Sequence, residues 1–122
     1  METVLKAIYE EMQAVGVQYY DMTNTSPKVT YPYVTGELTQ SLYDFEDGSN
    51  NGDLLLEAWT RGERFELVSL NEKIKQHFKD LIKEKDGKVI HFSYVGAIPQ
   101  RTNDNTLKKL QINLDITWWE GE

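Results

Sequence analysis

Hydrophobic positions recur along the chain with two different periods, and each period predicts a different kind of element. Near the N-terminus they recur every three or four residues among charged ones, which predicts an amphipathic helix over residues 3–15. Gly16 follows at the position where a glycine commonly ends a helix. The apolar residues of this stripe are Val4, Leu5, Ile8, Met12 and Val15.

A second helical pattern starts with Ser69-Leu70-Asn71-Glu72, where a serine followed three residues later by a glutamate is the signature of a capping box. An apolar stripe continues through about Lys85, and Asp86-Gly87 ends it. Residues 63–68 leave open whether an earlier turn of helix precedes the box. The stripe consists of Leu70, Ile74, Phe78, Leu81 and Ile82.

Alternation between apolar and polar residues predicts the strands. It is strongest from Lys109 to Trp119, where it indicates a sheet with one buried and one wet face. The strand at 88–94 should pair with this last strand as an antiparallel hairpin with a long tip. Residues 54–60 are largely apolar on both faces and should be central in the sheet. A further strand is expected at 17–22, and the segments 29–38 and 41–45 together are expected to supply another.

Turn-forming residues separate these strands. Residues 47–53, Asp-Gly-Ser-Asn-Asn-Gly-Asp, and the polar stretch 98–105 are both expected to be exposed loops. The patterns predict one α+β domain over residues 1–122. It should have a single mixed or antiparallel sheet of about five strands with two helices packed on it, in the order α-β-β-β-α-β-β.

The composition excludes several classes of protein. The 122 residues include no cysteine, so a disulfide framework, a thiolate metal site and a cysteine nucleophile are ruled out. The N-terminal residues lack the basic start and apolar core of a signal peptide, and no apolar run approaches the ~20 residues that span a bilayer. We therefore expect no membrane insertion and synthesis in a reducing cytosol.

The charge balance argues against tight nucleic-acid binding. Thirteen basic residues face 20 acidic ones, for a net charge of −7, whereas binding of phosphates relies on Lys and Arg. Acids dominate residues 37–66 and lysines outnumber acids over 72–88. Such a bipolar subunit could attract copies of itself head to tail. A solvated acidic sheet edge beside a solvated helix face is the alternative interpretation.

Candidate chemistry is sparse. Neither His77 nor His91 has a second histidine or a carboxylate at metal-ligand spacing. The acids around residues 44–53 do not follow the spacing of a calcium loop, and the glycines there precede Asp53-Leu54, not the Lys-Ser/Thr of a phosphate-binding loop. We predict no catalytic residues, no cofactor and no metal, and hence no enzyme.

Two adjacent tryptophans suggest a contact surface. Neighbouring residues of a strand point to opposite faces, so if Trp118 continues the buried row, Trp119 is directed to the polar face. An exposed tryptophan there would be a candidate contact for another subunit. The alternative is that one of the helices covers it.

Four stretches, taken together, suggest a family. They are the opening helix, the segment 29–37 with its Pro-Tyr-Val, the strand end Ala58-Trp59-Thr60-Arg61, and the closing segment 101–112. In order and in length they resemble the tail terminator (tail completion) family of long-tailed phages and their prophages. The chain departs from the family in an extended stretch at 63–68.

This resemblance implies a structural virion protein of the tail or neck, made in the bacterial cytoplasm. Its subunits would form a ring, usually a hexamer, that caps the tail tube, stops its growth and receives the head connector or stopper. The implied partners are further copies of itself, the tail-tube protein and the connector, without a cofactor. Loops on a compact sheet are where such assemblies make contacts. The candidate interface residues are Asp47, Asn50, Asp53, Arg101, Asn103, Asp104 and Trp119.

Two other interpretations stay open. Another neck or head-completion (stopper) protein would share size, acidity and lack of chemistry, but would bind the portal side and not the tube. A small-molecule-binding or enzymatic α+β domain would instead enclose a pocket. The residues that would line this pocket are Tyr31, Tyr33, His91 and Tyr94.

Overall fold

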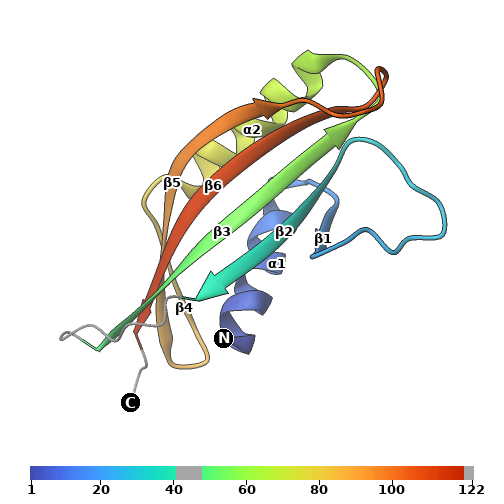
Figure 1. Cartoon of the computed structure of the whole chain (residues 1–122). Coiled ribbons are helices and arrows are strands. Elements are labelled where there is room, and N and C mark those ends of the chain that lie inside the picture. Colours follow the sequence, from blue (N-terminus) through green and yellow to red (C-terminus); the bar gives the residue numbers. More distant parts are fainter. Residues whose placement is uncertain (41–47, 120–122) are drawn as a thin grey trace.

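The computed structural model describes residues 1–40 and 48–119, so the predicted strand 41–45 and Asp47 lie outside the described residues. The chain order is α-β-β-β-α-β-β-β (Figure 1). The elements are α1 (Glu2–Val15), β1 (Tyr19–Asp21), β2 (Tyr33–Gln40), β3 (Ser49–Thr60), α2 (Arg64–Phe78), β4 (Leu81–Lys85), β5 (Lys88–Gln100) and β6 (Lys108–Trp119).

The strands form one curved, mixed sheet in the order β1-β2-β3-β6-β5-β4. β1 runs parallel to β2, and the other neighbours are antiparallel. The α+β class, the two helices, the central position of β3 and the closing β5–β6 hairpin are therefore as expected. The sheet has six strands and not about five, because β4 was assigned to a helix.

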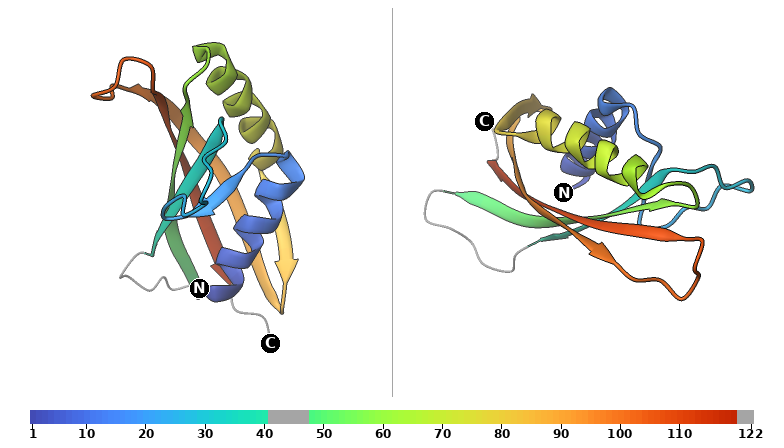
Figure 2. Two further views of the ribbon diagram at one scale, coloured as in Figure 1. Left: turned by 90° about the vertical axis from the view of Figure 1, so that its right-hand side faces the viewer. Right: turned by 90° about the horizontal axis from the view of Figure 1, so that it is seen from above.

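Both helices lie on one face of the sheet, and within the described chain no helix covers the other face (Figure 2). β6 shows the consequence most clearly. Its even-numbered residues from Leu110 to Trp118 are buried beneath the helices, and its odd-numbered residues lie on the open face, where they are half-buried or exposed. The largest fully buried side chains between the two layers include Trp118, Phe78 and Phe92. We call the uncovered side of the sheet the open face.

The predicted second helix is wrong at both ends. α2 begins five residues earlier than Ser69, where the backbone N–H of Glu63 donates a 2.7 Å hydrogen bond to Oε1 of Glu66 in a capping box. The stretch 63–68 is thus mostly helical and not extended. The helix ends at Phe78, because Asp80 adopts a left-handed φ of 53° that turns the chain into β4. Residues Leu81–Lys85 are an edge strand paired with β5.

The two predicted loops are shorter than expected. Ser49–Asp53 pair with Trp119–Asp115 of β6 and so belong to β3, and β5 extends through Gln100. Gly52 fits there because a Cβ would lie 2.9 Å from Leu38 and 3.2 Å from Trp118. Cross-strand pairing with the long β6 thus outweighs the turn preference of these residues. No helix in the described ranges is long and apolar enough to cross a bilayer.

Candidate assembly surfaces

The tip of the β5–β6 hairpin lies beside the end of β3 and the start of α2 (Figure 1). Arg61 fastens it there, since its Nη1 donates to Oδ2 of Asp104 at 2.6 Å and to Oγ1 of Thr106 at 2.7 Å. The guanidinium also lies 5.7 Å from the ring centroid of Tyr31. Asp104 also accepts hydrogen bonds from the backbone N–H and the hydroxyl of Thr106. The bond from Arg61, and after it those from Thr106, lower the pKa of Asp104 to about 2. The tip is therefore held against β3 while remaining exposed.

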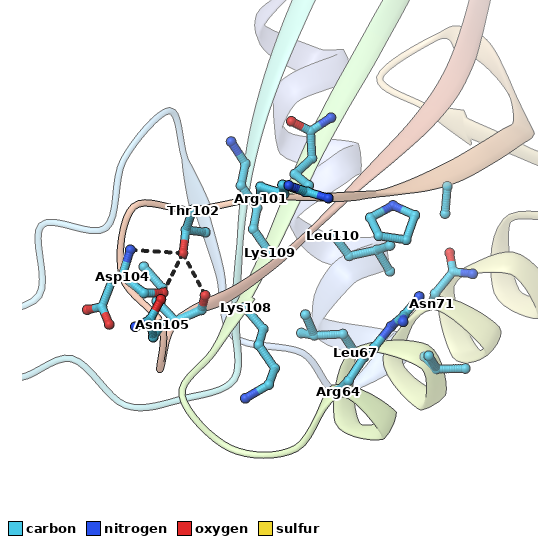
Figure 3. A pocket seen from close by; sticks show the side chains of 15 residues that line it. Arg64, Leu67, Asn71, Arg101, Thr102, Asp104, Asn105, Lys108, Lys109 and Leu110 are labelled. Carbon is cyan, nitrogen blue, oxygen red and sulfur yellow. Dashed lines mark hydrogen bonds between the residues drawn. The ribbon is translucent and has the colours of Figure 1, made fainter.

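The Thr102 side chain stabilises the backbone of the hairpin tip by hydrogen bonds. Its hydroxyl lies 2.7 Å from the carbonyl oxygens of Asp104 and Leu107, and it accepts a 3.3 Å hydrogen bond from the Asp104 backbone N–H (Figure 3). Polar side chains that bond to nearby backbone in this way favour defined turns. The tip therefore presents its outward side chains from a fixed backbone.

A groove of about 660 Å³ runs between the hairpin and the first half of α2 (Figure 3). Arg64 of α2 and Arg101 of the hairpin come from its two walls, and Lys108 lies near its end. Both arginines are exposed, and neither forms an ion pair or side-chain hydrogen bond with another described residue. The apolar residues of the lining include Leu67, Ala97, Leu107 and Leu110.

The groove is positively charged even though the protein as a whole is acidic. Two further charged residues of its lining are neutralised, because Lys109 pairs with Glu57 and Asp104 pairs with Arg61. Arg64 and Arg101 remain without an anionic partner in the described chain, so the groove offers two guanidinium groups to an external anion.

Aromatic side chains organise the end of the open face nearest the hairpin tip. The ring of Tyr33 stacks on that of Trp59 at 6.3 Å, and Tyr20 meets Tyr33 edge-on at 6.1 Å. On β6, Nζ of Lys109 lies 4.8 Å from the Trp59 ring centroid and pairs with Glu57. This strip joins β1, β2, β3 and β6 by side-chain contacts at an end of the sheet that the helices do not cover.

Two carboxyl groups meet farther along the open face. Asp53 of β3 and Asp115 of β6 are direct cross-strand partners, so their carboxyl groups lie side by side on the open face. Partial burial raises the pKa of Asp115, and the hydrogen bond that protonated Asp115 can donate to Asp53, together with the Asp53 charge, raises it further. The next residues along the same row are the uncharged Thr39 and Ser93, which provide no cation to offset the pair.

The predicted interface residues fall into two separate places. Arg101, Asn103 and Asp104 share the hairpin tip, as expected from the sequence. Asn50, Asp53 and Trp119 lie toward the other end of the β3–β6 pair, where Asn50 is the partner of Trp118. Trp119 is half-buried on the open face, opposite in direction to the buried Trp118, as expected. Asp47 lies outside the described residues. The interface role of this set stays a prediction.

Sequence reasoning missed Arg64 and Asp115. The sequence pattern indicates an extended stretch around Arg64 and leaves an earlier turn of helix open. The alternation along the last strand puts Asp115 on the polar face, but the turn-forming residues 47–53 predict a loop for its partner Asp53. Assigning residues 49–53 to a strand would have brought the two acids face to face.

The residues of the alternative small-molecule pocket do not come together in the fold. Tyr94 points toward the helices, where its hydroxyl donates a 2.9 Å hydrogen bond to Oδ1 of Asn71. His91 projects from the opposite face between Ile82 and Thr117, and β3 and β6 separate it from Tyr33. These side chains therefore do not line one cavity.

His77 connects the two helices. Its Nε2 lies 2.9 Å from Oε1 of Glu11, so the side chain joins α2 to α1. The described residues contain no group of three or more His, Asp or Glu placed to hold a metal ion.

Comparison with known proteins identifies solved structures that share this fold. No family model and no curated protein matches the chain. One solved structure, of a protein whose name gives no functional description, aligns over 100% of this chain and 98% of its own, with a TM-score of 0.72 and 11% identity. A chain from the virion of a native gene transfer agent particle aligns over 91% of this chain and 90% of its own, with a TM-score of 0.68 and 14% identity. At such identities the likeness shows a shared fold.

Proposed function

We propose that this protein is a structural virion protein that acts as a tail terminator. Its subunits form a hexameric ring that caps the tail tube and joins it to the head connector. The observation that supports this most directly is the fold shared with a chain of a gene transfer agent virion, because the alignment covers about nine-tenths of both chains. The terminator role within a virion is suggested by the sequence resemblance of the opening helix, the Pro-Tyr-Val strand and the closing hairpin.

The shape and charge of the subunit suit this role. A ring subunit needs different surfaces toward its neighbours, the tube and the connector. This chain has a basic groove beside a projecting hairpin, and an open sheet face with an acidic pair. The net charge of −7 also suits a ring through which DNA must pass without being retained.

The proposed role needs no reaction. His77 and Glu11, a histidine–carboxylate pair of the described chain, join α1 to α2 in the helix layer. The proposal therefore assigns the protein neither catalysis nor a cofactor.

The test is to assemble tail tubes from the tube subunit of the same phage or prophage and to add this protein. We expect electron microscopy to show a cap at one end of each tube and tube growth to stop. Native mass spectrometry of the capped material should give six copies of the chain per tube. A bovine serum albumin addition at equal mass controls for non-specific adsorption of an acidic protein.

The same assay separates the terminator from the rival neck role. A protein that leaves tube growth unchanged but binds the connector would be a stopper, and the terminator proposal would then be wrong.

A further inference from the structure

The arginines of the groove differ from the cations around them. Two neighbouring cations are held in ion pairs within the chain, Arg61 with Asp104 and Lys109 with Glu57. The groove arginines Arg64 and Arg101 have no such partner among the described residues, and both are exposed to a prospective ligand. Guanidinium groups form strong, geometrically specific hydrogen bonds with carboxylates, often in a bidentate arrangement.

The open face carries acidic side chains that have no cation among their cross-strand neighbours. Asp53 and Asp115 oppose each other across the β3–β6 pair. Glu37 projects from the same face, two residues before Thr39, which is the β2 partner of Asp53. Like charges directly opposite each other in a sheet repel and destabilise the fold. An external cation bound between the two carboxylates would offset this repulsion.

These two places cannot meet within one subunit. Arg101 follows the end of β5 beside Pro99, whose partner Leu110 lies on the helix-covered side. Asp53 and Asp115 lie on the open face, seven residues along β3 from the Thr60 end that borders the hairpin tip. A guanidinium group at the groove can therefore reach such a carboxyl pair only on another molecule.

We propose that the groove arginines Arg101 and Arg64 of one subunit bind the Asp53–Asp115 pair on the open face of a second copy of this chain. The proposal rests on the proposed function, because it names the contact through which neighbouring ring subunits join. The chain itself supplies both halves of the match, and this charge complementarity is the reason for choosing a second copy as the occupant. The contact joins two different surfaces, so it is heterologous and generates a ring where the rotation closes.

A charge-swap experiment tests the contact. Arg101→Glu and Asp115→Arg are prepared as separate full-length proteins, and their mass is followed by light scattering at low salt. A repulsive contact should weaken self-association of either variant at least about tenfold relative to wild type. In an equimolar mixture, Glu at position 101 of one variant meets Arg at position 115 of the other, and the native Arg101 meets the native Asp115. Assembly should therefore return in the mixture.

Matched reversals elsewhere control for net charge. Lys28→Glu and Glu84→Arg make the same charge changes at exposed positions that belong neither to the groove lining nor to the acidic pair, and they should leave association unchanged. Circular dichroism melts confirm that each variant is folded. Asp115→Asn, which adds no bulk, provides a second and milder variant whose association should weaken in the same direction.

The outcomes separate this contact from the proposed function. If the wild-type protein stays monomeric at its highest soluble concentration at low salt, the proposed contact is wrong. The terminator role is then decided separately by the tube-capping assay. Wild-type rings unaffected by either reversal would overturn the contact and leave the terminator role standing. If Arg101→Glu leaves self-association intact but abolishes binding to tubes, the groove arginines bind the tube subunit. That result would also overturn the proposed contact between copies.

Discussion

Replacing Asp115 by asparagine should make the protein more stable and less able to self-associate. In the folded chain the Asp115 carboxyl lies opposite that of Asp53 and can donate a hydrogen bond to it only when protonated. An asparagine side chain has nearly the same shape, donates a hydrogen bond without needing a proton from solvent, and removes one of the two facing charges. The substitution thus removes a repulsion while keeping the contact.

The size of the gain follows from the position of the pair. Cross-strand charge pairs contribute about 0.2–1 kcal/mol to the free energy of unfolding, and this pair is largely solvated, so we expect about 0.5 kcal/mol. With an unfolding entropy of about 2.1 cal/mol/K per residue, the 122-residue chain has about 0.26 kcal/mol/K in total. The expected rise in Tm at pH 7 is therefore about 2 °C.

The gain should depend on pH with a defined sign. The folded-state pKa of Asp115 is raised above its ordinary value of 3.8, so the native protein binds this proton more tightly than the unfolded chain does. The resulting stabilisation is complete below the unfolded pKa and is lost as the pH rises through the folded pKa. Wild type is therefore penalised at pH 7, and the advantage of Asp115→Asn should shrink as the pH falls toward 3.8.

Urea denaturation at pH 7 and at pH 4 measures the effect, with Glu72→Gln as a control that removes an exposed charge from α2. The control should change stability little at either pH. A destabilised Asp115→Asn protein, or a gain that is equal at both pH values, would refute the interpretation of the pair as a repulsive contact.

Three further substitutions test the fold around these surfaces. Phe78→Ala empties a fully buried site at the end of α2 and should cost about 3–5 kcal/mol in urea denaturation, whereas an exposed lysine of the same helix changed to alanine should cost far less. Gly36→Ala puts a Cβ 2.1 Å from the Tyr19 hydroxyl and should lower the free energy of unfolding by about 1–3 kcal/mol. The loss should be smaller in a Tyr19→Leu background, and equal losses in the two backgrounds would contradict the steric explanation. Arg61→Met should raise the pKa of Asp104 from about 2 toward 3.8 in an NMR titration and should speed hydrogen exchange at the hairpin tip. An unchanged Asp104 titration would show that another group sets this pKa.

The helices show where sequence periodicity is reliable and where it misleads. α1 matches its prediction because its stripe, its glycine stop and its length agree. For α2, Leu81 and Ile82 continue the helical spacing, although they belong to β4 after the left-handed turn at Asp80. The true start was missed because Glu63 is not among the residue types usually found at the N-cap, whereas Ser69 is.

The two candidate assembly surfaces differ in how far the sequence alone predicts them. The hairpin tip was predictable, because a polar loop between two alternating strands is a local pattern. The acidic pair was not, because Asp53 lies in a turn-rich stretch that becomes a strand only through pairing with β6. The groove depends on where α2 begins, which is decided by the packing of Leu67 and Leu70 into the core as much as by local propensity.

The alternation along β6 has a consequence for how this fold can drift in evolution. Stability constrains the even-numbered positions from Leu110 to Trp118, which pack under the helices, more than the odd-numbered positions on the open face. Substitutions can therefore accumulate on the open face without unfolding the subunit. A lineage that exchanged partners repeatedly would keep the backbone and rewrite the surface, and this fits structures that superpose well at 11% and 14% identity.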